Sequence, residues 1–169
     1  MVMFMVSTGC FYAGVPKMGR LYLSGNFAEL EQHLEKKEKG EQALEHEELA
    51  YLCAAYWKLK KYDKFFACAE RMEASLKRGK PEVSWLLWDV SYSHLWGTAY
   101  AYIELGDYAK AVEWAAKSYE IGRQKQLDVF HEVYSLSALA LAYAFSGDRA
   151  NALKYAALLE KVKPRNPSS

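Results

Sequence analysis

Hydrophobic and small residues recur at helical spacing on both sides of a turn that occurs four times along the chain. The turns lie near residues 25, 60, 106 and 147, which gives spacings of 35, 46 and 41 residues. In each unit an apolar or small residue stands seven and four positions before the turn and five and nine positions after it. Sustained strand-like alternation bounded by turn residues is missing. The pattern therefore predicts an all-α chain of helical hairpins with a loose period.

The turns carry signals that end one helix and start the next. In "LGDY" (residues 105–108), glycine can end a helix in the left-handed conformation, and aspartate can cap the amides of the following helix. The equivalent positions hold Gly25-Asn26, Lys60-Lys61, which lacks the glycine, and Gly147-Asp148. Each turn is thus predicted to join two helices directly.

These signals predict eight helices in four antiparallel pairs. The expected spans are 11–24, 27–38, 42–59, 61–78, 82–105, 107–124, 128–146 and 148–162. The fifth helix is expected to start at Pro81 and to run on, because no helix breaker occurs before Gly97. Residues 1–163 are predicted to form a single domain. Residues 164–169 have no apolar anchor and are predicted to form a linker or disordered tail.

Small residues and tyrosines around the turn are most regular in the last two units. They are Ala99, Tyr102, Ala111 and Ala115 in the third unit and Ala140, Tyr143, Ala152 and Ala156 in the fourth. This arrangement resembles the tetratricopeptide repeat, in which a small residue and a tyrosine precede a Gly-Asp-Tyr-type turn and an alanine follows it. The resemblance is good over 92–162, fair over 46–75 and poor over 11–38. The long spacings are similar to those of the long-hairpin variants of the family. The resemblance implies that the four helix pairs stack into a short right-handed superhelix.

Composition and charge narrow the function classes. The chain has 169 residues, 51% of them hydrophobic, which is enough for one packed domain. Lys and Arg number 22 against 21 Asp and Glu, so no excess of positive charge indicates a nucleic-acid partner. The three cysteines contain no CxxC pair, which argues against a disulfide framework or a zinc site and fits a reducing, cytoplasmic compartment.

The first ten residues allow a different location. In "MVMFMVSTGC", an apolar run is followed by small residues and Cys10, an order similar to the cleavage box of bacterial lipoproteins. The run is short, and a basic region before it is missing. We therefore keep two interpretations: an apolar first segment that packs on the next helix, and a lipid-modified Cys10 that would anchor the chain to a membrane.

Motifs for catalysis or cofactor binding are missing. "HEELA" and "HEVYS", which begin at His46 and His131, lack the second histidine of a zinc-protease helix. Nucleophile elbows, phosphate-binding loops and dinucleotide motifs do not occur. Cys53 stands at a helix-packing position and is expected to be a buried, inert thiol. We predict no enzymatic activity, no metal and no cofactor.

Binding is the better interpretation of the aromatic residues. The tetratricopeptide resemblance implies that the first helix of each pair lines a concave face with the residues three, six and ten positions before the turn. Large apolar residues at these positions include Trp57, Trp96, Tyr100 and Leu141, and Tyr134 and Phe145 lie at flanking positions of the same groove. Aromatic side chains of this kind often dominate binding energy at interfaces. In an alternative interpretation, long tilted helices bury the same rings in the core.

We therefore expect a non-catalytic interaction module that holds an apolar peptide or protein segment in an aromatic groove. Some family members hold chaperone carboxylates with lysine and asparagine, but the equivalent positions here are mostly apolar. Two alternatives remain: a regulatory or sensing segment of a larger signalling protein, and a lipoprotein scaffold anchored through Cys10. Self-association is also compatible with the sequence, since the terminal units of a solenoid leave an apolar face open.

Overall fold

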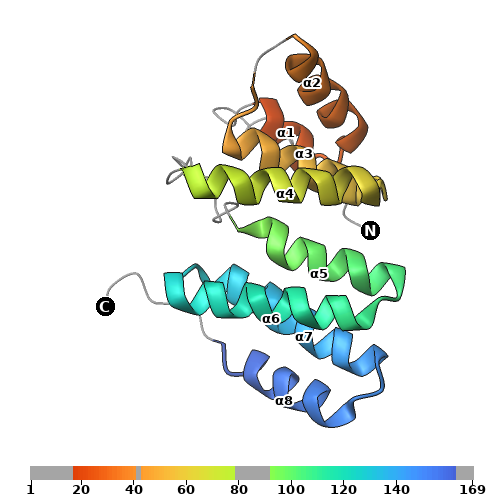
Figure 1. The fold of residues 1–169 in the computed structure, drawn as a ribbon, viewed down its shortest axis with the longest axis vertical. Coiled ribbons are helices and arrows are strands. Elements are labelled where there is room, and N and C mark those ends of the chain that lie inside the picture. The colour runs from red at the N-terminus through yellow and green to blue at the C-terminus, as the bar shows by residue number, and fades with distance from the viewer. Residues whose placement is uncertain (1–16, 41–42, 79–91, 163–169) are drawn as a thin grey trace, which may run out of the picture.

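The computed structural model of the chain describes residues 17–40, 43–78 and 92–162. These residues form α-helices and no strand, which confirms the all-α class (Figure 1). The helices are α1 (Lys17–Leu23), α2 (Phe27–Lys39), α3 (His46–Lys58), α4 (Tyr62–Arg78), α5 (Ser93–Leu105), α6 (Tyr108–Lys125), α7 (Val129–Phe145) and α8 (Arg149–Leu159). The predictions for Cys10 and for the tail at 164–169 fall outside the described residues.

The helical hairpins follow one another along the long axis of the molecule, with α2 at one end and α8 at the other (Figure 1). Each helix packs on its neighbours in sequence, and α1, α3, α5 and α7 also pack on one another in turn. The second helices of the hairpins, as far as the structure describes them, do not pack on one another in this way. Closely packed first helices therefore form one side of the molecule. Among the described helices, none is long and apolar enough to cross a bilayer.

The predicted turns are present, and their geometry explains the glycines. Gly106 has φ 79° and Gly147 has φ 83°, in the left-handed region where a side chain is strained. The carboxylates of Asp107 and Asp148 accept from the third backbone amide beyond them, at 3.2 and 3.0 Å. Asn26 stands at the expected cap position but makes no cap hydrogen bond with its side chain.

One turn and one helix depart from the predicted pattern. Lys60 has φ 59°, which is the left-handed conformation that glycine adopts in the other turns. The fifth helix begins at Ser93, because Tyr92 has φ −112° and ψ 8°, outside the helical region. The predicted uninterrupted helix over 82–105 is therefore wrong at Tyr92. Residues 91–93 ("SYS") include no helix breaker, so the sequence carries no clear signal for a helix start at Ser93. Serine and tyrosine have only modest helix propensity, which is compatible with a helix that begins there.

Small side chains allow close helix contacts in the third hairpin, as predicted. Ala99, Ala111 and Ala115 are completely buried. Leu30 and Phe65 occupy the position of Ala111 in the first two hairpins and are also buried. Ala152, at the same position in α8, is only half-buried because, among the described helices, α8 packs on α7 alone.

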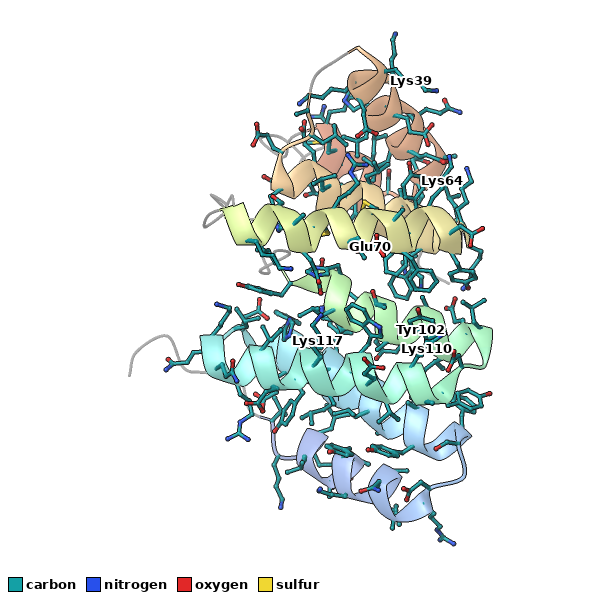
Figure 2. The ribbon with its side chains drawn as sticks, viewed as in Figure 1. Lys39, Lys64, Glu70, Tyr102, Lys110 and Lys117 are labelled. Carbon is teal, nitrogen blue, oxygen red and sulfur yellow. A yellow bond between two sulfur atoms is a disulfide. The ribbon has the colours of Figure 1, made fainter. Side chains whose placement is uncertain are left out.

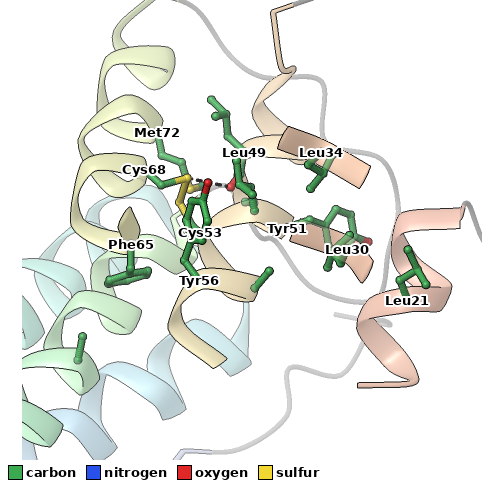
Figure 3. Packing of buried hydrophobic residues seen from close by; sticks show 14 residues of the cluster. Leu21, Leu30, Leu34, Leu49, Tyr51, Cys53, Tyr56, Phe65, Cys68 and Met72 are labelled. Carbon is green, nitrogen blue, oxygen red and sulfur yellow. Dashed lines mark hydrogen bonds between the residues drawn. A yellow bond between two sulfur atoms is a disulfide. The ribbon is translucent and has the colours of Figure 1, made fainter. Parts of the chain in front are cut away.

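A disulfide joins Cys53 of α3 to Cys68 of α4, with Cα atoms 5.5 Å apart (Figure 3). This distance is typical of disulfides. The expectation of an inert Cys53 thiol is therefore wrong. The hairpin explains the pairing: the two cysteines lie equally far on either side of the Lys60–Lys61 turn, so antiparallel helices bring them together. The bond is buried beside Leu49, Phe65 and Met72.

Candidate functional site

Four of the six predicted groove residues form a continuous group of rings across three first helices. Trp57 of α3 lies 6.1 Å from both Trp96 and Tyr100 of α5, measured between ring centroids. Trp96 stacks on Tyr134 of α7 at 4.5 Å, with an angle of 18° between the ring planes. Trp57, Trp96 and Tyr100 are half-buried, and Tyr134 is 43% exposed. The rings are thus packed together but are still partly open to solvent.

The other two predicted residues lie elsewhere. Leu141 and Phe145 stand in the second half of α7, where they are 40% and 58% exposed. Neither residue lines the cavity that lies beside the ring group and is described next. Phe145 instead stacks on Tyr108 at the start of α6, at 5.7 Å between centroids. The prediction concerned which side of the hairpins the six residues face, not how far along each helix they lie. Tyr134 and Phe145 are three turns apart on α7, so they cannot both lie beside the same group of rings.

A cavity of about 150 Å³ lies beside the ring group, between α1, α3, α5 and α7; we call it the aromatic pocket. Most of its lining is aromatic or small. The described lining residues are Tyr22, Ala50, Tyr51, Cys53, Ala54, Trp57, Phe65, Ser93, His94, Trp96, Gly97, Asp128, Phe130, His131 and Tyr134. Four lining rings of phenylalanine or tyrosine, those of Tyr22, Tyr51, Phe65 and Phe130, are absent from the predicted set.

A sequence signal for the missed rings was present but weak. Tyr22 lies three residues before Gly25, which is the same offset that selects Trp57 and Ile103 in their hairpins. It contacts Tyr51 edge-on at 5.8 Å. Phe130 stands in the first turn of α7, so only the observed packing of α7 against α5 brings it to the pocket.

Burial changes the acidity of the phenols around the pocket. The pKa of Tyr22 is raised, first by burial and then by the neighbouring Tyr134. Burial also raises the pKa of Tyr100, although a hydrogen bond with Ser137 offsets part of this effect. Burial, and then the charge of Glu47, raises the pKa of Tyr51 to about 12. All three phenols therefore stay neutral at physiological pH.

The polar wall of the pocket is built around the start of α7. The Asp128 carboxylate accepts from the His131 amide at 2.8 Å and caps the helix. His131 is 2% exposed, and its Nε2 lies 3.1 Å from the Ser118 hydroxyl oxygen. That hydroxyl lies 2.7 Å from the Ser135 hydroxyl. These groups hold α6 against α7.

This polar cluster does not have the properties of a catalytic site. Ser118 and Ser135 are fully buried, so neither hydroxyl can reach a substrate. His46, His94 and His131 are also buried. Within the described ranges, no three His, Cys, Asp or Glu side chains are placed to hold a metal ion.

The opposite side of the hairpins is charged and paired. Lys64 of α4 bonds Glu35 of α2 at 2.8 Å, and Lys117 of α6 pairs with Glu73 of α4. Figure 2 shows Lys64, Lys110 and Lys117 on this side of the ribbon. Such exposed pairs contribute little to stability, typically below about 1 kcal/mol each. They give the second helices a hydrated surface, in contrast to the rings on the first helices.

Comparison with protein-family models, with curated proteins and with solved structures finds no match for this chain. The tetratricopeptide resemblance is therefore a prediction that depends on the repeated residues themselves.

Proposed function

We propose that the chain is a non-catalytic interaction module that binds an apolar protein segment along the side formed by α3, α5 and α7. We further propose that the hairpins form a right-handed superhelix of the tetratricopeptide type with this side as its concave face. The packing supports this arrangement, since the first helices pack closely on one another, whereas the second helices meet through long charged side chains such as Lys64 and Glu35. Tighter packing on one side of a row of hairpins curves the row toward that side.

The observation that carries the proposal is the partial exposure of the ring group. Trp57, Trp96, Tyr100 and Tyr134 contact one another, yet each keeps solvent-accessible area. Aromatic clusters that are pre-packed lose little side-chain entropy when a partner covers them. Burial of apolar area contributes about 25 cal/mol per Å² before ordering costs, so covering these rings supplies part of the binding free energy and the rest comes from the other contacts of the segment.

The test begins with selection of apolar peptides on the intact chain from a random library, followed by calorimetric titration. Trp96→Ala combined with Tyr100→Ala should weaken the complex at least tenfold while the helical circular dichroism persists. The matched control is Phe66→Ala combined with Tyr102→Ala. That pair is also stacked, at 4.8 Å, but lies between α4 and α5 outside the pocket. Equal affinities for the two double variants would refute the proposal.

The Cys53–Cys68 disulfide favours one of the alternatives on location. Disulfides persist in oxidising compartments and are rare in the cytosol of mesophiles. The bond therefore supports the scaffold exported and anchored through Cys10 over the cytoplasmic module. The intact mass of the chain, expressed with its natural upstream sequence, tests this. A diacylglyceryl adduct on Cys10 is expected, and an unmodified, unprocessed chain would contradict the anchored form.

A further inference from the structure

We infer that the aromatic pocket is the anchor point for the bound segment and accepts one neutral ring of benzene size, the side chain of a phenylalanine. This inference rests on the proposed function, because the ring is supplied by the segment that the inner side binds. It goes further because it names the side chain that occupies the pocket, whereas the proposed function names only an apolar segment.

The size of the pocket sets the first limit. Its volume is about 150 Å³. A buried apolar cavity of about that volume in another protein holds a benzene molecule. One phenyl ring therefore fills the pocket, whereas the methyl group of an alanine would leave most of it empty.

The lining sets the second limit. Aromatic rings line the cavity, among them those of Tyr22, Tyr51, Trp57, Trp96 and Tyr134. Aromatic pairs in offset-stacked or edge-to-face geometry are worth more than their buried area alone. A phenyl ring can make several such contacts here, since the lining rings already meet one another at angles from 18° to 75°.

The charge of the lining sets the third limit. Among the described lining residues, Asp128 carries the one carboxylate, and its Oδ1 already accepts from the His131 amide. Apart from this wall the lining is mainly apolar, so a charged side chain would lose its hydration without enough replacement partners. The pocket therefore selects a neutral group.

Exposed apolar side chains stand beside the pocket to receive the rest of the segment. Phe130 is 49% exposed and Tyr134 is 43% exposed, and both belong to the lining. A ring inserted in the pocket thus leaves its backbone next to the first turns of α7, where flanking residues can cover these two side chains.

The test uses the full chain and three small probes: benzene, N-acetyl-phenylalaninamide and N-acetyl-alaninamide. The readout is the indole N–H resonances in a nitrogen-15 correlation spectrum. Benzene and the phenylalanine probe should shift the signals of Trp57 and Trp96, which line the pocket. The signal of Trp114 on α6, outside the described lining, should stay in place. The phenylalanine probe should bind about ten- to a hundredfold more tightly than the alanine probe, because its ring leaves water.

Two variants locate the binding. Ala54→Phe fills the pocket from α3 and should abolish the benzene shifts, whereas Ala144→Phe, at an exposed position of α7, should leave them unchanged. Benzene that shifts neither indole signal in the unmodified chain overturns the inference, whatever the variants do. Equal affinity for the phenylalanine and alanine probes overturns the assignment to a side chain.

The inference and the proposed function can fail separately. Selected peptides that need Trp96 and Tyr100 but contain no aromatic residue would leave the function standing and overturn the phenylalanine anchor. If benzene and the phenylalanine probe bind in the pocket but the chain binds no apolar peptide, the proposed function is overturned. The conclusion that the pocket accepts one neutral ring would then stand.

Discussion

Gly122 provides a sharp test of the packing between α6 and α7. A glycine inside a helix normally costs about 1 kcal/mol relative to alanine, so Gly→Ala is usually stabilising. Here a Cβ on Gly122 would lie 2.6 Å from Cδ2 of His131 and 3.2 Å from Nε2. The imidazole is 2% exposed and is held by Ser118, so it cannot move aside without losing buried contacts.

The magnitude follows from three contributions. Overpacking a tight interface costs about 1–3 kcal/mol. Displacing the His131 ring from its hydrogen bonds with Ser118 costs about 1–3 kcal/mol more. The helix propensity of alanine returns about 1 kcal/mol. Gly122→Ala should therefore lower the free energy of unfolding by about 3 kcal/mol, within a range of about 1–5 kcal/mol. At about 3 kcal/mol the Tm should fall by about 6–12 °C for a chain of this size.

The assay is urea and thermal unfolding followed by circular dichroism at 222 nm. Gly97→Ala is the matched control, since its Cβ would lie 3.4 Å from Cζ of Phe65, an ordinary contact. It should be neutral or stabilising by up to about 1 kcal/mol. In a His131→Ala background the cost of Gly122→Ala should disappear. The reasoning is refuted if Gly122→Ala stabilises the chain, or if its cost is the same with and without the His131 ring.

Three further predictions concern the disulfide, a strained turn and alkaline pH. Reduction should lower the free energy of unfolding by about 3 kcal/mol, because the Cys53–Cys68 bond spans 15 residues. The control is Cys53→Ala, whose urea midpoint should not change with reductant. A urea midpoint of the unmodified chain that is insensitive to reductant would contradict this prediction. Lys60→Gly should raise stability by up to about 1 kcal/mol in thermal unfolding, since Lys60 has φ 59°; a loss of stability would count against the strain. The pKa of Tyr51 rises to about 12 in the folded chain against about 10 when exposed, so its contribution is complete below pH 10 and is lost between pH 10 and 12. Urea titrations should therefore show a steeper loss over this window in the unmodified chain than in Tyr51→Phe, and parallel losses would argue against the shift.

Local signals predicted the hairpins well because they act within a few residues. A glycine that needs positive φ and an aspartate that caps an amide mark the turns at Gly106-Asp107 and Gly147-Asp148, and both features are present. The start of α5 at Ser93 has no such signal, since nothing at Tyr92 breaks a helix by itself.

The disulfide and the pocket depend on contacts between helices. The pairing of Cys53 and Cys68 could have been found from their equal distances to the Lys60–Lys61 turn, but the lack of CxxC spacing pointed the other way. The hairpin offsets placed Trp57 and Trp96 on one face, and Tyr134 was predicted at a flanking position of the same face. The separate position of Phe145 did not follow from these offsets, because it depends on the observed stacking with Tyr108.

The most direct test of the proposed function is hydrogen–deuterium exchange of the full chain with and without a selected apolar peptide. Binding along the first helices predicts slower exchange in α3, α5 and α7, with the largest change near Trp96 and Tyr134. The charged second helices α4 and α6 should change little. Protection that instead concentrates on α4 and α6 would contradict the account.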